Sequence, residues 1–255
     1  MTHVRKGIYF LVFLSTLIAA LVIHKRTQAD ENNCTVDWCG ERNAVLYDVS
    51  SHFSKEDIRF KMAATASHII NFGILLVGVP LELAGMLLAQ FGRASSARAG
   101  HTVVVYLLSV GMVYAITLLF KSAIPRQRPA AYFNMTNVTE LGSKDATDEF
   151  ESFFSGDASL AAHAATFFFL FSSGIKPCWR ATAIFFFQCL AVTGIMLRVV
   201  ALMHWPSDVL TGAAVGTLVA GISYACFKFD VGMDEDEGSM HLLISVGELK
   251  SAGML

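Results

Sequence analysis

The sequence predicts an all-α integral membrane protein with about six transmembrane helices. Of its 255 residues, 54% are hydrophobic and only 16% are charged, whereas roughly 25% of the residues in a typical soluble domain are charged. Six apolar stretches approach the roughly 20 residues that a helix needs to cross the bilayer core. These stretches run over residues 8–24, 66–91, 101–120, 158–175, 181–198 and 208–227. The net charge of −2 gives no electrostatic basis for binding nucleic acid.

The first apolar stretch, 8–24, has two interpretations. Residues 27–29, Thr-Gln-Ala, resemble a signal-peptidase site, which would make residues 1–29 a cleaved signal peptide. Lys25 and Arg26 lie just ahead of that site and fit an uncleaved membrane anchor better. We therefore favour a retained N-terminal transmembrane helix.

The remaining chain divides into three predicted regions. Residues 30–65 form a non-cytoplasmic loop, residues 66–230 a polytopic core, and residues 231–255 an acidic cytoplasmic tail. Short loops rich in Lys and Arg stay in the cytoplasm, and the loops after the second and fourth apolar stretches are of this kind. The alternate loops, including 121–157 and 199–207, then face the lumen or the cell exterior.

Potential glycosylation sites agree with this orientation. Asn33, Asn134 and Asn137 each begin an Asn-x-Thr sequence in a predicted non-cytoplasmic loop. Glycan acceptors are useful only on the lumenal side of the secretory pathway, so the sequence favours the endoplasmic reticulum or the plasma membrane. None of the five cysteines lies in a spacing typical of a zinc site.

Charged residues gather where three apolar stretches end or begin. Lys121 opens the segment "KSAIPRQRP", Asp157 lies in "SGDAS" at the start of the fourth stretch, and "LRVVALMHWPSD" precedes the sixth. All three segments lie on the same predicted face of the membrane. Because short-looped helices of a bundle bring their ends together, we expect the three segments to form one site.

The expected content of that site is typical of a phosphate pocket. Lys121, Arg128 and Arg198 supply positive charge, and the helix beginning at Ser155 and Gly156 supplies backbone amides. Several cations together with a helix N-terminus are what a phosphate dianion requires. The neighbouring Arg126 either joins this pocket or faces lipid headgroups.

His204 and Asp208 are four residues apart, a spacing that puts both side chains on one face of a helix. A carboxylate on one ring nitrogen fixes the tautomer of a histidine and makes the other nitrogen the nucleophile. This pair predicts covalent phosphohistidine chemistry. No metal is needed, since the cations can neutralise the transferring phosphoryl group.

These segments resemble the type 2 phosphatidic acid phosphatase family of membrane lipid phosphatases, which shares a helical core with vanadium haloperoxidases. The family's first motif, Lys, six residues, Arg-Pro, stands here as Lys121 to Pro129, and its third, Ser-Arg, five residues, His, three residues, Asp, stands as "LRVVALMHWPSD". The resemblance implies that His204 attacks phosphorus while Asp208 orients it. It also implies catalysis without a metal or other cofactor, at a site on the lumenal or extracellular side.

The chain departs from the family pattern at three positions. Leu197 replaces the serine before the arginine, Phe154 replaces the proline of Pro-Ser-Gly-His, and Asp157 replaces its histidine. That histidine is the family's general acid, and a free Asp is a weaker proton donor at neutral pH. Either the surroundings of Asp157 restore it as the acid, or the leaving group needs little protonation, as in a lipid diphosphate. His163 points away from Asp157 on a helix, because six residues rotate by about 240°, and fits a packing role.

The predicted function is therefore a metal-independent phosphatase that acts on a lipid monophosphate or diphosphate from the bilayer, such as a phospholipid or isoprenoid phosphate. Two alternatives use the same residues. A lipid hydroxyl in place of water would make the protein a headgroup phosphotransferase, and loss of the acid would leave a weakly catalytic lipid-phosphate-binding protein.

Overall fold

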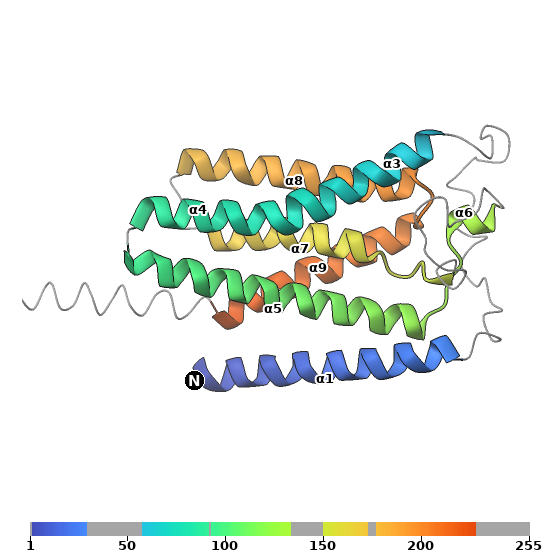
Figure 1. The fold of residues 1–255 in the computed structure, drawn as a ribbon, viewed down its shortest axis with the longest axis horizontal. Coiled ribbons are helices and arrows are strands. Elements are labelled where there is room, and N and C mark those ends of the chain that lie inside the picture. Colours follow the sequence, from blue (N-terminus) through green and yellow to red (C-terminus); the bar gives the residue numbers. More distant parts are fainter. Residues whose placement is uncertain (1, 30–57, 92, 134–149, 173–176, 228–255) are drawn as a thin grey trace, which may run out of the picture.

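The computed structural model describes residues 2–29, 58–91, 93–133, 150–172 and 177–227 (Figure 1). In these ranges every regular element is a helix, which confirms the all-α prediction. The elements are α1 (Thr2–Ala29), α3 (Ile58–His68), η1 (Ile69–Gly78), α4 (Val79–Phe91), α5 (Arg93–Ala123), α6 (Pro129–Tyr132), α7 (Gly156–Phe171), α8 (Pro177–Val200) and α9 (Pro206–Phe227). The predicted glycan acceptors, the tail and most of the 30–65 loop lie outside the described residues.

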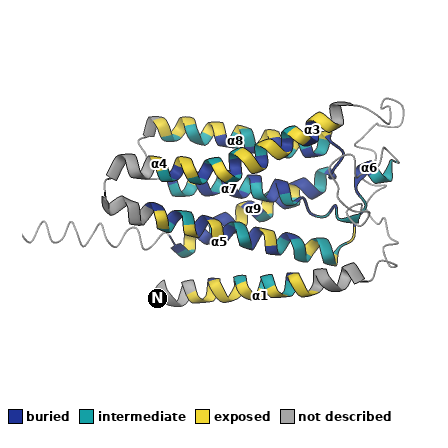
Figure 2. Cartoon of the chain, in the orientation of Figure 1, coloured by how far each residue is buried: buried dark blue, intermediate teal, exposed yellow. Residues whose placement is uncertain are grey.

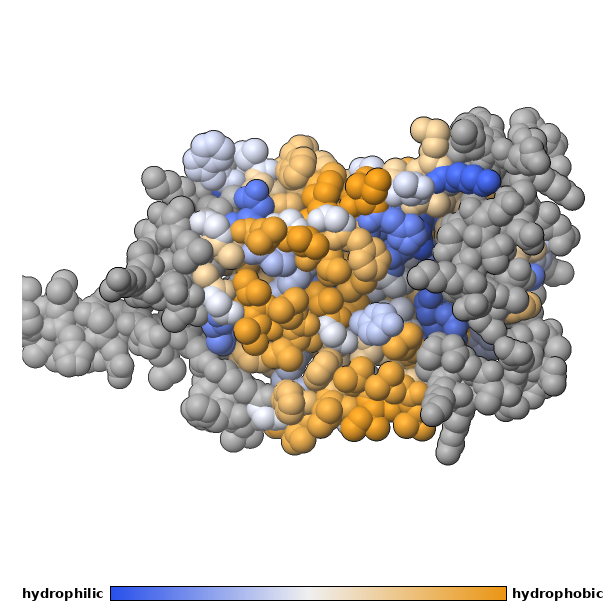
Figure 3. All heavy atoms as spheres, in the orientation of Figure 1, coloured by the Kyte–Doolittle hydropathy of each residue, from blue (hydrophilic) through white to orange (hydrophobic). Residues whose placement is uncertain are grey.

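Four of the described helical segments are long and apolar enough to cross a membrane, which confirms a multi-pass membrane protein. They are Lys61–Gly85, Ala99–Ala123, Trp179–Val200 and Pro206–Phe227, and two shorter apolar helices cover Gly7–Val22 and Gly156–Phe171. Large apolar side chains such as Phe185 and Leu210 are more than two-thirds exposed. Exposed residues lie along the helices (Figure 2), and the face of the bundle seen in Figure 3 is apolar over its middle, where lipid chains would lie.

α3, η1 and α4 form one continuous rod over residues 58–91. The rod begins before residue 66, the start that hydropathy alone predicted, because Ala63 and Ala64 are buried and continue the helix towards the N-terminus. Its middle, Ile69–Gly78, is wound as a π-helix. Pro80, the second residue of α4, has no amide hydrogen to continue the ordinary helical hydrogen bonds.

The closest helix pair of the bundle is α7 with α9, and two glycines of α9 make it possible. A Cβ atom on Gly216 would lie 2.0 Å from the carbonyl oxygen of Ser159, and one on Gly212 would lie 2.4 Å from that of Ser155. Only a glycine allows backbones to approach so closely. The contact fixes the N-terminal turns of both helices side by side, and Ser155 N–H donates to the Asp208 carbonyl oxygen at 3.1 Å.

α1 lies along α5 and also contacts α9 (Figure 1). The Tyr9 hydroxyl is 2.9 Å from the Ser223 hydroxyl of α9, and the Phe13 ring fills the space above Gly111 of α5. The helix therefore packs on the core as an anchor would. Its retention after processing stays a prediction.

Candidate functional site

The three charged segments meet at one end of the bundle, as predicted. The end of α5, the start of α7 and the turn between α8 and α9 all lie at the same end of the bundle as α6 (Figure 1). Six charged or titratable side chains there are at least nine-tenths buried: Arg126, Arg128, Asp157, Arg198, His204 and Asp208. Lys121, in the last turn of α5, lies at the edge with a side chain that is 17% exposed.

Two irregular segments are held together by their backbones at this end. Arg126 N–H donates to the Phe150 carbonyl at 2.7 Å, and Ser152 N–H donates to the Arg126 carbonyl at 2.9 Å. The segment before α7 thus runs beside the segment after α5. This pairing brings Ser152, a residue that no motif singled out, into the centre of the site.

Ser152 sets the tautomer of His204. Nδ1 of His204 lies 2.8 Å from the carbonyl oxygen of Ser152. A carbonyl oxygen only accepts hydrogen bonds, so Nδ1 carries the proton and Nε2 keeps its lone pair. Nε2 is therefore the nitrogen that can act as a nucleophile.

The His204 ring is buried within a positive field. Burial, followed by the charges of Arg128, Arg198 and Lys121, holds the pKa of His204 well below its ordinary value of 6.5. A low pKa keeps the imidazole neutral at physiological pH. The ring of His204 is therefore neutral and has its unprotonated nitrogen at Nε2, which is the form that a nucleophilic histidine requires.

The structure corrects the expected partner of Asp208. Its carboxylate forms an ion pair with Arg126, accepts the Ser152 hydroxyl at 2.5 Å and accepts Trp205 N–H at 3.1 Å. The expected direct bond to His204 assumed helical geometry through residue 204, but α9 begins at Pro206. Asp208 therefore caps the start of α9 and supports His204 through Ser152, whose carbonyl holds the ring.

Arg126 belongs to the interior and not to the headgroup region. Besides Asp208, its guanidinium donates to the Ser207 hydroxyl at 2.9 Å and lies 5.5 Å from the ring centroid of Trp205. Trp205 is itself fixed, because its Nε1–H donates to the Gln127 carbonyl at 2.8 Å. Arg126 is thus held by contacts with Asp208, Ser207 and Trp205.

Ser155 and Gly156 occupy the predicted helix start. Ser155 is the N-cap of α7, and its hydroxyl oxygen accepts Ala158 N–H at 3.3 Å. The first amides of α7 provide the partial positive charge that an anion prefers. A Cβ atom on Gly156 would come within 3.1 Å of the Thr117 methyl group, so a larger residue there would press on α5.

Two of the predicted phosphate cations contact carboxylates of the same chain. Arg198 forms an ion pair with Asp157, and Nζ of Lys121 lies 3.7 Å from Glu151. Arg128 is buried at the N-cap of α6, with one guanidinium nitrogen 4.0 Å from the Met203 sulfur. Asp157, at the position where the family pattern has histidine, is thus an acceptor for the arginine expected to hold phosphate.

Arg198 has a further neighbour that the motifs did not indicate. Its other terminal nitrogen lies 3.1 Å from Nε2 of His68, the last residue of α3. The one clue in the sequence is that His68 is an ionisable residue within the second apolar stretch.

Leu197 and Phe154, the other two departures from the family pattern, make apolar packing contacts. Leu197 contacts a small apolar cluster that includes Ala63 and Met203. Phe154 is fully buried with its ring 5.5 Å from that of Phe120. His163 lies in the interior, with Nε2 2.8 Å from the Ser109 hydroxyl, which matches its expected packing role.

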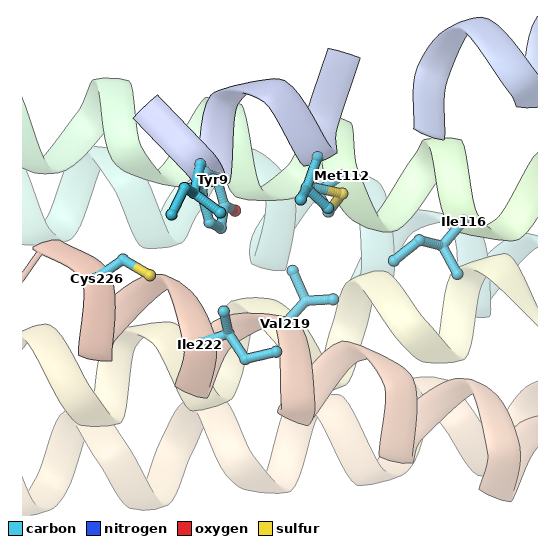
Figure 4. Close-up of a pocket in the computed structure, with 8 residues that line it drawn as sticks. Tyr9, Met112, Ile116, Val219, Ile222 and Cys226 are labelled. Carbon is cyan, nitrogen blue, oxygen red and sulfur yellow. The ribbon is translucent and has the colours of Figure 1, made fainter. Parts of the chain in front are cut away.

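An apolar pocket lies away from this chemistry, between α1, α5 and α9 (Figure 4). Its lining includes Tyr9, Met112, Ile116, Val219, Ile222 and Cys226, and no predicted site residue contributes to it. Among the described residues, no three His, Cys, Asp or Glu side chains are grouped to hold a metal ion.

Comparison with known families matches the part of the chain that builds the site. A model of the PAP2 superfamily matches residues 102–231, just over half of the chain. No curated protein and no solved structure matches. The matched region runs from α5 through α9 and includes all of the predicted phosphate-binding and catalytic residues. The chain therefore belongs to the PAP2 superfamily, whose members are phosphoesterase hydrolases, and is a multi-pass membrane protein.

Proposed function

We propose that this protein hydrolyses a lipid monophosphate or diphosphate through a phosphohistidine formed on His204. The observation that carries the proposal is the hydrogen bond between His204 Nδ1 and the Ser152 carbonyl oxygen. It makes Nε2 the unprotonated nitrogen of a ring buried beside several cations. A protein that only bound lipid phosphates would have no need for a histidine held in its nucleophilic tautomer.

The phosphate group would lie among Lys121, Arg128 and Arg198, with the first amides of α7 as further donors. These groups stabilise the charge that the phosphoryl oxygens carry during transfer. His204 Nε2 forms a bond to phosphorus as the bond to the leaving oxygen breaks. Water then attacks the phosphohistidine and releases inorganic phosphate.

Asp208 and Arg126 take a supporting part in this proposal. The carboxylate holds the Ser152 hydroxyl, and the Ser152 carbonyl holds the ring of His204. Arg126 balances the charge of the buried carboxylate. The pair therefore keeps the nucleophile oriented without contacting phosphorus.

The substrate would enter sideways from the bilayer, since the site lies at the end of membrane-spanning helices. The charge distribution of the loops supports a position of this end in the lumen or outside the cell. A product phosphate is then released into that compartment, and the dephosphorylated lipid stays in the membrane.

Purified full-length protein should be tested for phosphate release from phosphatidate, sphingosine phosphate and farnesyl diphosphate between about pH 4 and pH 8. His204→Ala should lower the rate by roughly 10³-fold or more on every substrate. Quenching a reaction of phosphate-labelled substrate in alkaline denaturant should trap a phosphoenzyme in wild type only, and acid should then release its label. Release that survives His204→Ala would overturn the mechanism, and no release from any substrate by wild type would favour a lipid-phosphate receptor.

A further inference from the structure

His68 is an ionisable residue in a membrane-spanning segment, at the edge of the phosphate site. It ends α3, it lies within the span Lys61–Gly85, and its side chain is exposed. Ionisable residues inside membrane spans are costly and usually functional. His68 also lies outside residues 102–231, so the superfamily match assigns it no role.

The contact between His68 and Arg198 shows which nitrogen of the His68 imidazole is unprotonated. A guanidinium only donates hydrogen bonds, so Nε2 of His68 accepts from Arg198 at 3.1 Å and the ring is neutral there. The charged groups that act on this ring are Arg198, Asp157 and Arg128. Two cations and one carboxylate thus act on a ring whose Nε2 contacts Arg198, a predicted phosphate-binding residue.

Asp157 is poorly arranged to give a proton. Its carboxylate is the acceptor in the ion pair with Arg198, so its oxygens are already engaged with that guanidinium. His68 contacts the other terminal nitrogen of the same guanidinium, and its side chain is exposed. The part of a lipid substrate that leaves must pass along the lipid-facing surface, because the lipid chain remains in the bilayer.

We propose that His68 is the general acid of the reaction, in the role that the superfamily pattern gives to the histidine replaced by Asp157. The inference rests on the proposed function. A phosphate dianion on Arg198 takes over the guanidinium hydrogen bonds and favours a protonated His68. Nε2 of His204 then bonds to phosphorus, the bond to the leaving oxygen breaks, and the leaving oxygen takes the electron pair and the proton from Nε2 of His68. In the second step a water oxygen bonds to phosphorus, the bond between phosphorus and Nε2 of His204 breaks with its electron pair returning to Nε2, and the water proton goes to Nε2 of His68.

The test compares leaving groups. His68→Gln keeps an oxygen that accepts from Arg198 but cannot transfer a proton. On phosphatidate, whose alkoxide needs a proton, kcat should fall by about 10²- to 10⁴-fold. On p-nitrophenyl phosphate, whose phenolate leaves without help, the loss should be less than about tenfold, and this activity also shows that the variant is folded. The limb of the pH profile where activity falls at high pH should disappear on phosphatidate.

His101→Gln is the matched control, since His101 lies near the opposite end of α5 against Phe227; its activity on both substrates should equal that of wild type. Equal losses on both substrates in His68→Gln, with an unchanged pH profile, would make His68 a residue that only positions Arg198 and would overturn the proposal. A leaving-group-dependent loss in Asp157→Asn, with none in His68→Gln, would overturn it in favour of Asp157. Activity that survives His204→Ala would instead refute the proposed phosphohistidine mechanism, so the two failures are distinguishable.

Discussion

The carboxylate of Asp157 and the guanidinium of Arg198 form an ion pair that ties the first turn of α7 to the last turn of α8. Both residues are buried. A substrate phosphate that binds Arg198 must compete with the carboxylate of Asp157 for the guanidinium and is repelled by its negative charge. The residue that departs most from the family pattern therefore affects how strongly the site holds an anion.

Asp157→Asn should tighten the binding of anions. Removing one carboxylate frees Arg198 and ends the repulsion of the phosphate, so the inhibition constant of inorganic phosphate should fall roughly tenfold, which corresponds to about 1.4 kcal/mol. The measurement is product inhibition of phosphate release at constant pH. An inhibition constant that stays the same or rises would show that Asp157 does not compete with phosphate for Arg198.

Removing one partner of the Arg126–Asp208 ion pair should destabilise the protein more than removing the charges of both partners. Arg126→Met leaves the carboxylate of Asp208 buried without its cation, and such losses cost about 3–5 kcal/mol. The double variant Arg126→Met with Asp208→Asn should lose less than the sum of the two single variants, because no charge is left unpaired. Thermal unfolding of the detergent-solubilised proteins measures the difference. Strict additivity would mean that the pair is not coupled.

The contact between α7 and α9 should not tolerate a side chain at Gly216. Its Cβ would lie 2.0 Å from the Ser159 carbonyl oxygen, so Gly216→Ala should separate the helices and destabilise the protein by about 2–3 kcal/mol. Activity should fall as well, because the same contact aligns Ser155 with Asp208. Gly221→Ala is the control on the same helix. Nothing lies within 4 Å of its added Cβ, and it should gain up to about 1 kcal/mol from better helix propensity.

The low pKa of His204 should make stability depend on pH. The unfolded histidine takes up a proton below its ordinary pKa of 6.5, whereas the buried ring does not. The unfolded state therefore binds more protons in acid, and stability should fall as the pH decreases from about 7 to 5, by at most about 1.4 kcal/mol per pH unit. His204→Gln should lack this part of the dependence, since its amide can still donate to the Ser152 carbonyl but does not titrate. Parallel pH profiles of unfolding temperature for the two proteins would contradict the assigned burial.

Local patterns predicted the elements of the fold but not the contacts inside the site. The apolar stretches located the helices because a hydrophobic run is visible in the sequence itself. The four-residue spacing of His204 and Asp208 gave the wrong contact, because the rule holds within a helix and α9 begins only after His204. Nothing local indicated Ser152, whose role depends on a pairing with Arg126 across the loop.

The sequence alone determined that the chain is helical, crosses the membrane, and carries its charged segments at helix ends on one side. These properties follow from hydropathy and from the alternation of short loops, which act over a few residues at a time. Only the tertiary structure decided that Asp157 contacts Arg198, that Ser152 orients His204, and that His68 of α3 borders the site. Each of these contacts joins residues from separate helices or loops, so it depends on how the helices pack, and that packing is set by features such as the glycines of α9.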